Sequence, residues 1–291
     1  GVPRLNTLTL PRLLVFFVPL ALSWVLMSVD GPVSLSLVGM MADPKVQAAA
    51  FLVMFGISLW IESPVIDLLT TGNRLATDRE AIPKLERFTL AIMGAVTVVH
   101  AAVAFNPLYD LVARGILGAP PEVQEAARIP LQIMTPWSAA IGWRRWRQGL
   151  MIREGITRPI TMGTIVRVIA LCAVGYPLTW STQLPGLQIA AYALAASVVT
   201  EAIFIHYASL EARRRIMRLE RTEPPLTYSE LARFHFPLTA STMVTLSGLP
   251  LVGAALAQLP NPVDQMAGWQ AALSAAFCFR TSTFAIPEVV V

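Results

Sequence analysis

Charged residues are scarce in this 291-residue chain. Asp, Glu, Lys and Arg make up only 14% of it, whereas about a quarter of a typical soluble domain is charged. Hydrophobic residues supply 55% of the sequence, and many of them gather in runs long enough to cross a lipid bilayer. This balance excludes an ordinary soluble domain and predicts an all-α, polytopic integral membrane protein.

Cysteine is also rare, and both copies, Cys172 and Cys278, fall inside hydrophobic runs, so no disulfide framework is expected. The sequence lacks the GK[ST] phosphate loop, the HExxH zinc helix and the GxSxG nucleophile elbow. Its three histidines lie far apart, with no second ligand at helical spacing. We therefore expect no catalytic residues, no metal site, and no cofactor apart from a coupling proton or sodium ion.

Eight hydrophobic segments are predicted to span the membrane. They cover residues 13–39, 48–71, 88–105, 129–143, 160–180, 187–207, 234–259 and 266–291. A short interfacial helix is expected between the third and fourth segments. The predicted domains are an N-terminal six-helix transmembrane lobe (1–208), a cytoplasmic basic connector (209–233), and the first two helices of an incomplete C-terminal lobe (234–291).

Lys and Arg residues gather in alternate gaps between these segments. The N-terminus, the gaps after the second and fourth segments and the connector together hold seventeen, whereas the remaining gaps hold three. Cations are retained on the cytoplasmic side of a membrane. The pattern predicts a cytoplasmic N-terminus, and we expect the protein in the bacterial inner membrane.

The sequence also repeats itself at a shift of 218 residues. Without a gap, this shift aligns Pro19 with Pro237, Ser23 with Ser241, Pro32 with Pro250, and Pro44 with Pro262. The repeat unit is six spans plus the connector, so both copies enter the membrane from the same side. Parallel repeats of this kind are typical of transporters that bind substrate between the two halves. Two pseudo-symmetric lobes are therefore expected, with the second reduced here to two helices.

Two segments carry a family resemblance. The first span, FVPLALSWVLMSVDGPV, and the segment QGLMIREGITRP resemble the multidrug and toxic compound extrusion (MATE) transporters of the multidrug/oligosaccharidyl-lipid/polysaccharide exporter superfamily. The resemblance implies two lobes around a central cleft, alternating access, and export driven by protons or sodium. It places Asp30 where the proton-coupled branch has its first-helix aspartate.

The sequence departs from the MATE pattern at two places. The span that contains Arg167 holds no acidic residue, and the seventh span lacks a carboxylate where the sodium-coupled branch has a glutamate. The ESP sequence of the second span and the arginine-rich end of the fourth resemble the ankylosis-type branch instead. That branch implies organic anions as substrates.

Five ionisable residues lie within predicted spans, and they are our candidates for ion coupling or for the substrate cleft. They are Asp30, Glu62, Arg167, Glu201 and Arg280. Ionisable groups at membrane depth are costly, so they commonly mark functional sites. The alternatives are a helix-kink cap or a residue near the outer interface for Asp30, a fixed ion pair for Glu62, and side chains of Arg167 and Glu201 that reach the headgroups. The repeat aligns Glu62 with Arg280, which predicts an ion pair across the cleft.

The leading functional hypothesis is a secondary active exporter of small organic compounds, driven by proton or sodium antiport. The alternatives are a flippase of lipid-linked saccharide or another amphipathic lipid, and an exporter of organic anions. Expected partners are a small-molecule substrate and membrane lipid, with no nucleic acid, and the protein is expected to be a monomer.

Overall fold

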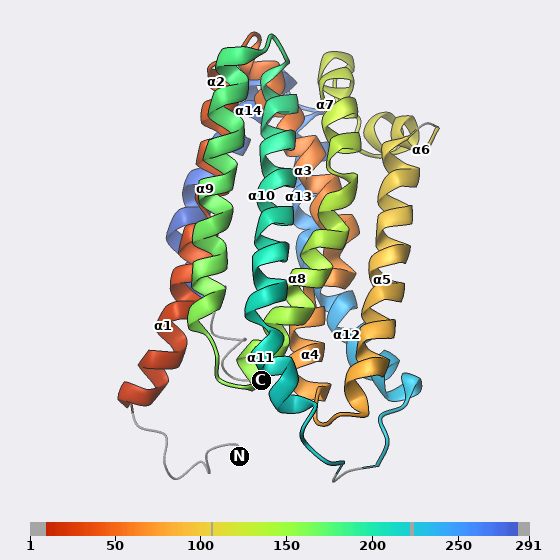
Figure 1. Cartoon of the computed structure of the whole chain (residues 1–291). Coiled ribbons are helices and arrows are strands. Elements are labelled where there is room, and N and C mark those ends of the chain that lie inside the picture. Colours follow the sequence, from red (N-terminus) through yellow and green to blue (C-terminus); the bar gives the residue numbers. More distant parts are fainter. Residues whose placement is uncertain (1–9, 106, 222–223, 285–291) are drawn as a thin grey trace.

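The computed structural model describes residues 10–105, 107–221 and 224–284 of the chain. Within these ranges every regular element is helical, and the long helices run side by side (Figure 1). Six helical segments among the described residues are long and apolar enough to cross a membrane: Phe17–Gly39, Pro44–Leu75, Ala81–Ala104, Arg158–Ser181, Gly186–Ala208 and Tyr228–Leu256. The predicted all-α, polytopic membrane fold is confirmed.

The first predicted span is two helices, α1 (Leu10–Met27) and α2 (Asp30–Gly39). They separate at Ser28 and Val29, where the Ser28 hydroxyl donates a hydrogen bond to the Val25 carbonyl oxygen at 2.6 Å. Pro32 lies in the first turn of α2, where the missing N–H costs little because first-turn amides have no partner within the helix. The break therefore places the carboxyl group of Asp30 at a helix N-terminus, which favours negative charge.

The remaining helices follow the predicted order with shifted ends. They are α3 (Pro44–Ile66), α4 (Leu68–Leu75), α5 (Ala81–Ala104), α6 (Leu108–Asp110), the π-helical turn η2 (Leu111–Ile116), α7 (Pro121–Ile133), α8 (Thr135–Arg153), α9 (Arg158–Ser181), α10 (Gly186–Ala208), α11 (Leu210–Ile216), α12 (Tyr228–Leu246), α13 (Gly248–Leu256), α14 (Pro262–Arg280) and the 3₁₀ turn η3 (Thr281–Phe284). The short α6 and η2 occupy the place of the predicted interfacial helix. The end of the predicted eighth span, 285–291, lies outside the described residues.

The largest difference from the sequence prediction concerns the fourth span. Instead of ending at residue 143, α8 continues to Arg153 and carries Arg144, Arg145 and Arg147 through the interior, where they are 3%, 8% and 4% exposed. The prediction that these three arginines lie in a cytoplasmic gap is therefore wrong. They are buried because α4, α5 and α10 all pack against α8. Two of these helices also supply acidic partners, since Glu86 of α5 faces Arg147 and Glu201 of α10 pairs with Arg144.

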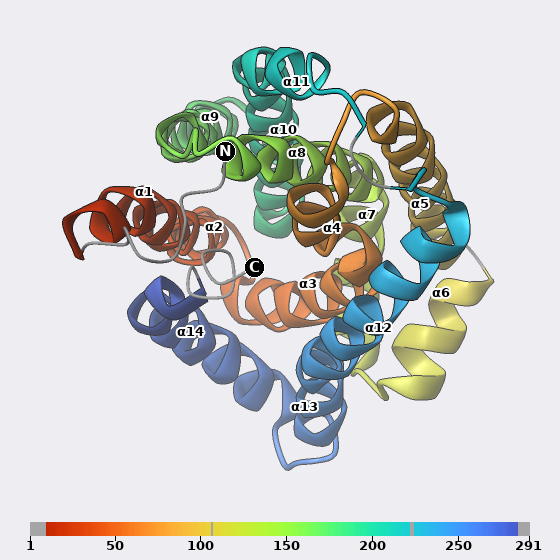
Figure 2. The same ribbon diagram turned by 90° about the horizontal axis from the view of Figure 1, so that it is seen from below.

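The core surrounds α3 and α8. Viewed from below, α3 lies between α8 on one side and α12, α13 and α14 on the other (Figure 2). Close approach of α4 and α8 depends on two glycines, since a Cβ atom on Gly149 would lie 3.0 Å from the Asn73 amide nitrogen and one on Gly72 would lie 2.9 Å from the Trp146 ring. Small residues at such contacts are the common means of packing helices in membranes.

The 218-residue repeat also relates the helix boundaries. The break between α12 and α13 at Ser247 corresponds to the break between α1 and α2, and α14 begins at Pro262 as α3 begins at Pro44. The residues before these prolines, Asp43 and Asn261, both adopt the left-handed conformation, with φ of 52° and 53°. Asp and Asn tolerate this conformation better than other residues with side chains. The two copies thus share their irregular backbone as well as their prolines.

Candidate functional site

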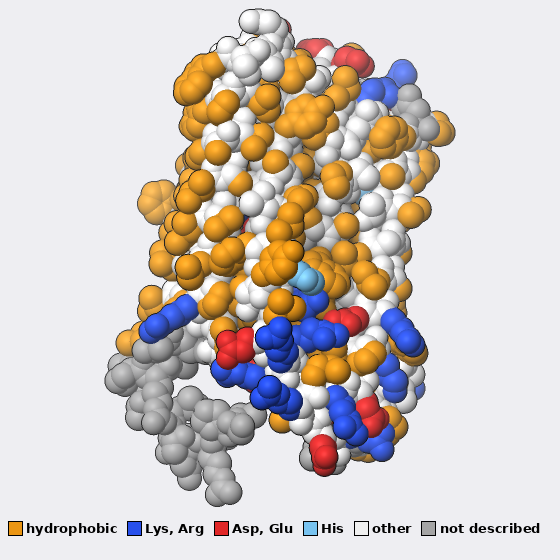
Figure 3. Space-filling model, viewed as in Figure 1, with side chains coloured by type: hydrophobic (Ala, Val, Ile, Leu, Met, Phe, Trp, Pro, Cys, Tyr) orange, Lys and Arg blue, Asp and Glu red, His pale blue; other side chains and the backbone are white. Residues whose placement is uncertain are grey.

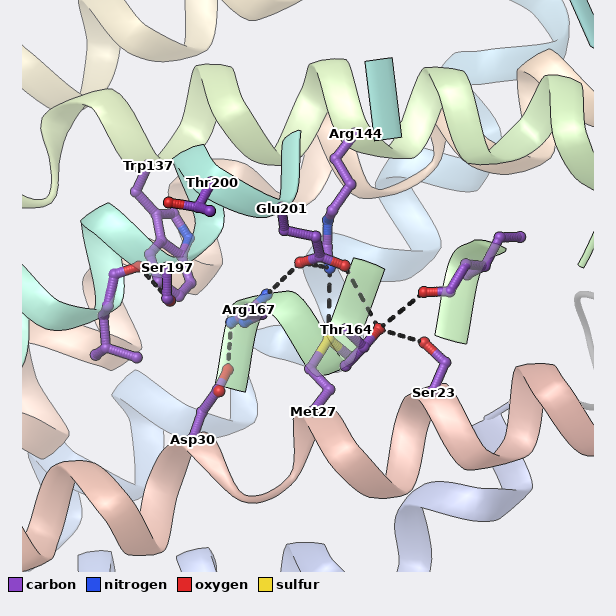
Figure 4. Close-up of polar contacts among 12 residues, drawn as sticks. Ser23, Met27, Asp30, Trp137, Arg144, Thr164, Arg167, Ser197, Thr200 and Glu201 are labelled. Carbon is purple, nitrogen blue, oxygen red and sulfur yellow. Dashed lines mark hydrogen bonds and ion pairs between the residues drawn. The ribbon is translucent and has the colours of Figure 1, made fainter. Parts of the chain in front are cut away.

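A buried chain of four charged side chains joins four helices. The Arg167 guanidinium on α9 donates to Asp30 Oδ2 on α2, and its Nη1 lies 3.4 Å from Glu201 Oε2 on α10. Arg144 Nη1 on α8 donates to the same Glu201 oxygen at 2.7 Å. Figure 4 shows the order Asp30–Arg167–Glu201–Arg144 (the ion chain). Three of the residues predicted from the sequence therefore meet in one place.

The ion chain is closed to solvent and balanced in charge. Asp30 is 7% exposed, Arg144 and Arg167 are each 3% exposed, and Glu201 is fully buried. Two carboxylates face two guanidinium groups, so the formal charges cancel. A single charge at this depth would carry a desolvation penalty of several kcal/mol, which its oppositely charged neighbours offset. The four residues therefore act as a unit, and a change in the charge of one alters the balance of all four.

Neutral groups extend the ion chain toward α1. The Thr164 hydroxyl lies 3.5 Å from Glu201 Oε1 and 2.7 Å from the Ser23 hydroxyl, and Arg144 Nη1 lies 3.8 Å from the Met27 sulfur (Figure 4). Both α1 residues precede the break between α1 and α2. The charged groups are thus in contact with both sides of this break.

Hydrogen bonding in the ion chain is incomplete. Within the described part of the chain, Asp30 Oδ1 and the Nε atoms of Arg144 and Arg167 are buried without a hydrogen-bond partner. A carboxylate normally accepts several hydrogen bonds. The free oxygen of Asp30 is therefore an unused acceptor that a proton could occupy.

Glu62 approaches the ion chain through Trp137. Its Oε2 atom accepts a hydrogen bond from the Trp137 indole, and the Arg167 guanidinium carbon lies 5.3 Å from the centre of the same indole ring. Glu62 is 2% exposed. The indole thus contacts a carboxylate through its N–H and a cation through its face, an arrangement that suits the charge distribution of an aromatic ring.

Arg280 does not join this group. It is exposed at the end of α14, and its guanidinium carbon lies 5.3 Å from the centre of the Phe284 ring. No ion pair joins it to Glu62 among the described residues, so the predicted cross-cleft pair is not formed. The repeat aligns the two positions, but Glu62 accepts a hydrogen bond from Trp137 of α8 instead. The functional roles of all five predicted residues remain predictions.

Arg144, Trp137 and Thr164 also belong to the site but are not among the residues predicted from the sequence. A usable signal was present, because Trp137 and Arg144 are seven residues apart and so share one face of a helix. Extending the fourth helix beyond residue 143 would have placed Arg144 at the depth of the other charged groups.

No protein-family model and no curated protein sequence matches the chain. Solved structures do match it. An inward-facing multidrug resistance MATE family transporter of the MOP superfamily aligns with a TM-score of 0.67 and 15% identity over 89% of this chain and 60% of its own. The MATE multidrug transporter DinF-BH, solved as a complex, aligns with a TM-score of 0.74 and 14% identity over 99% of this chain and 65% of its own.

A third structure is a MOP superfamily transporter from Pyrococcus furiosus, described as having a binding pocket of reverse polarity that suggests a different function. It aligns with a TM-score of 0.58 and 15% identity over 96% of this chain and 68% of its own. The chain thus spans between 60% and 65% of the length of the first two transporters. At these identities the likeness establishes architecture, and this chain has the fold of the MATE transporters of the MOP superfamily.

Proposed function

We propose that this protein is a secondary active exporter of small organic compounds, which works by antiport with an ion. The observation that carries the proposal is the ion chain, which is buried, balanced in charge and in contact with the break between α1 and α2. The fold supports the proposal, because the solved structures that share it include multidrug transporters.

The ion chain offers a physical route for coupling. With Asp30 ionised, Arg167 is held between Asp30 and Glu201. A proton on Asp30 would remove one of these two attractions and leave Arg167 and Arg144 sharing a single carboxylate. The contacts that join α2 to α9 would weaken, which would favour a different position of α2 relative to α1. A proton can shift the balance between two conformations only through such a difference in interaction energy.

A proton is the better candidate than sodium for the coupling ion. Sodium would have to bind beside Asp30 with the Arg167 guanidinium already in contact, and the two cations would repel each other at short range. A proton only neutralises the carboxylate. We therefore propose antiport driven by the proton gradient.

Export of organic anions is a second candidate, and a specific observation favours it. Arg145 and Arg147 of α8 are buried in addition to Arg144, so this helix carries more buried cations than the ion chain contains. A cationic environment attracts carboxylate or phosphate groups. The transporter from Pyrococcus furiosus offers a precedent within the same fold for a change in pocket polarity.

Transport into everted membrane vesicles would test both candidates. A panel of cationic dyes and organic acids should be offered under an imposed proton gradient and, separately, a sodium gradient. We expect accumulation under the proton gradient, and loss of that accumulation in Asp30→Asn. The matched control is Asp43→Asn, an exposed position where Asn keeps the left-handed cap.

The two candidates predict different outcomes. Accumulation of dyes supports the first, and accumulation of organic acids supports the second. Full gradient-driven transport by Asp30→Asn would refute the coupling role of Asp30. Accumulation under the sodium gradient alone would refute proton coupling.

A further inference from the structure

A shallow apolar groove lies on the outer face of α8 and α10, away from the ion chain. Its volume is about 310 Å³. The small side chains of Ala140 and Ala202 are among its lining residues, as are Trp143, Ile203 and Tyr207. Ile203 and Tyr207 are 55% and 67% exposed, as expected for side chains that face lipid in a membrane protein.

One end of the groove is polar. His206 lines it and stacks on Trp143 with ring centres 5.7 Å apart. The Trp143 indole N–H donates a hydrogen bond of 3.3 Å to His206 Nδ1, which leaves Nε2 of the imidazole as its donor. One helical turn further along α8, the Arg147 guanidinium carbon lies 4.6 Å from the centre of the Trp143 ring. The groove thus ends at an imidazole and an indole, with a guanidinium against the indole.

Arg147 has donors that the protein does not use. It is 4% exposed, yet its Nε and Nη1 atoms have no hydrogen-bond partner in the described part of the chain. Its nearest carboxylate, on Glu86, lies 4.0 Å away and is already held by Arg213 at 2.9 and 3.3 Å. Two cations therefore share one anion, which leaves a local excess of one positive charge.

The molecular surface around the groove is likewise apolar along most of its length and cationic at one end. In Figure 3, hydrophobic side chains cover the upper part of this face, and Lys and Arg side chains gather at its lower end. A membrane lipid has the complementary arrangement, since its acyl chains are apolar and a phosphate group lies at the level of the headgroups. Guanidinium groups bind phosphate through charge-assisted hydrogen bonds, and aromatic side chains favour the interface between tails and headgroups.

We propose that this groove binds one anionic glycerophospholipid. An acyl chain lies against Ala202 and Ile203, and the phosphate group lies at the polar end of the groove. There it accepts a hydrogen bond from His206 and is attracted by the incompletely neutralised charge of the buried Arg147. The excess charge selects an anionic headgroup over a zwitterionic one. This proposal is independent of what the protein transports.

Native mass spectrometry of the protein in a neutral detergent would test the site. Phosphatidylglycerol and phosphatidylcholine with identical acyl chains are titrated separately, and glycerol phosphate is added as a competitor without acyl chains. We expect phosphatidylglycerol to bind at least tenfold more tightly than phosphatidylcholine, and glycerol phosphate not to displace it.

Two variants and their matched controls locate the site. Arg147→Gln should weaken phosphatidylglycerol binding about tenfold, whereas Arg214→Gln, at an exposed position of α11, should leave it unchanged. Ile203→Trp fills the groove from an exposed, lipid-facing position and should also abolish the preference, which keeps the test valid if Arg147→Gln fails to fold. Its control is Ile169→Trp on α9, which is 62% exposed.

Several results would overturn the proposal. Equal affinity for phosphatidylglycerol and phosphatidylcholine would show that the groove does not discriminate between lipids by the charge of the headgroup. Unchanged phosphatidylglycerol binding in Ile203→Trp would place the lipid elsewhere. Displacement by glycerol phosphate would mean that the site recognises a soluble phosphate and not a lipid.

Discussion

At the scale of single residues, the energetics are dominated by charges that cannot reach water. Glu201 is fully buried and is the only carboxylate in contact with Arg144 within the ion chain. We expect Glu201→Gln to lower the free energy of unfolding by about 3–5 kcal/mol, because it leaves a buried guanidinium without its partner. Removal of both charges in Arg144→Met/Glu201→Leu should recover most of this loss, since apolar side chains of similar size often replace a buried ion pair without cost.

Reversible unfolding by denaturing detergent, followed by circular dichroism, would measure these differences. The control is Glu211→Gln, because Glu211 pairs with Arg215 on the exposed surface of α11 and such a pair contributes less than about 1 kcal/mol. Equal stability of Glu201→Gln and Glu211→Gln would contradict the assignment of the ion chain as a closed, mutually dependent unit.

At the scale of helices, the close approach of α4 and α8 requires residues without a side chain at their contact. A Cβ atom on Gly149 of α8 would overlap the Leu69 carbonyl oxygen of α4 and lie 3.0 Å from the Asn73 amide nitrogen. Backbone atoms cannot rotate away as a side chain can. We expect Gly149→Ala to destabilise the protein by about 1–3 kcal/mol, as overpacking does in other well-packed cores.

The matched control for this substitution is Gly94→Ala on α5. Nothing lies within 4 Å of the position that its Cβ would occupy, and the residue is exposed. Alanine is a better helix former than glycine, so this change should be neutral or slightly stabilising. Thermal unfolding of both variants in the same detergent gives the comparison. Equal melting temperatures would show that α4 and α8 do not pack as closely as the structure indicates.

At the scale of the whole molecule, the distribution of cations predicts the orientation in the membrane. Arg144, Arg145 and Arg147 are buried and do not belong to the surface count, but the side that bears α11 remains the more basic one. We expect a thiol reagent that cannot cross the membrane to label Lys45→Cys in intact cells. It should label Arg218→Cys only after permeabilisation. Both positions are exposed, and the ends of the molecule that carry them are opposite in Figure 1.

The labelling experiment requires Cys172→Ala and Cys278→Ala in the background, because both native cysteines are partly exposed. Labelling of Arg218→Cys in intact cells, with Lys45→Cys protected, would reverse the predicted orientation. It would also reverse the direction of the gradient needed in the vesicle assay.

The sequence by itself determined the features that depend on neighbouring residues. Long apolar runs predicted the helices, and the 218-residue shift aligned prolines that lie just after the helix breaks found at residues 28–29 and 247. The start of α12 also depends only on residues that are close in the sequence, because Thr227 and Glu230, three residues apart, form a capping box. Helix boundaries were less accurate, since packing extends helices beyond their apolar runs.

Only the tertiary structure decided which buried charges meet. Asp30 and Arg167 are 137 residues apart, and Arg144 and Glu201 are 57 apart. Their pairing depends on how each helix is rotated and on which helices are neighbours, and no local pattern carries that information. The same cause explains why Arg144 was assigned to a surface gap and Arg280 to a buried pair. The sequence gives the charge of each side chain, but the packing of the surrounding helices determines its partner and its depth in the membrane.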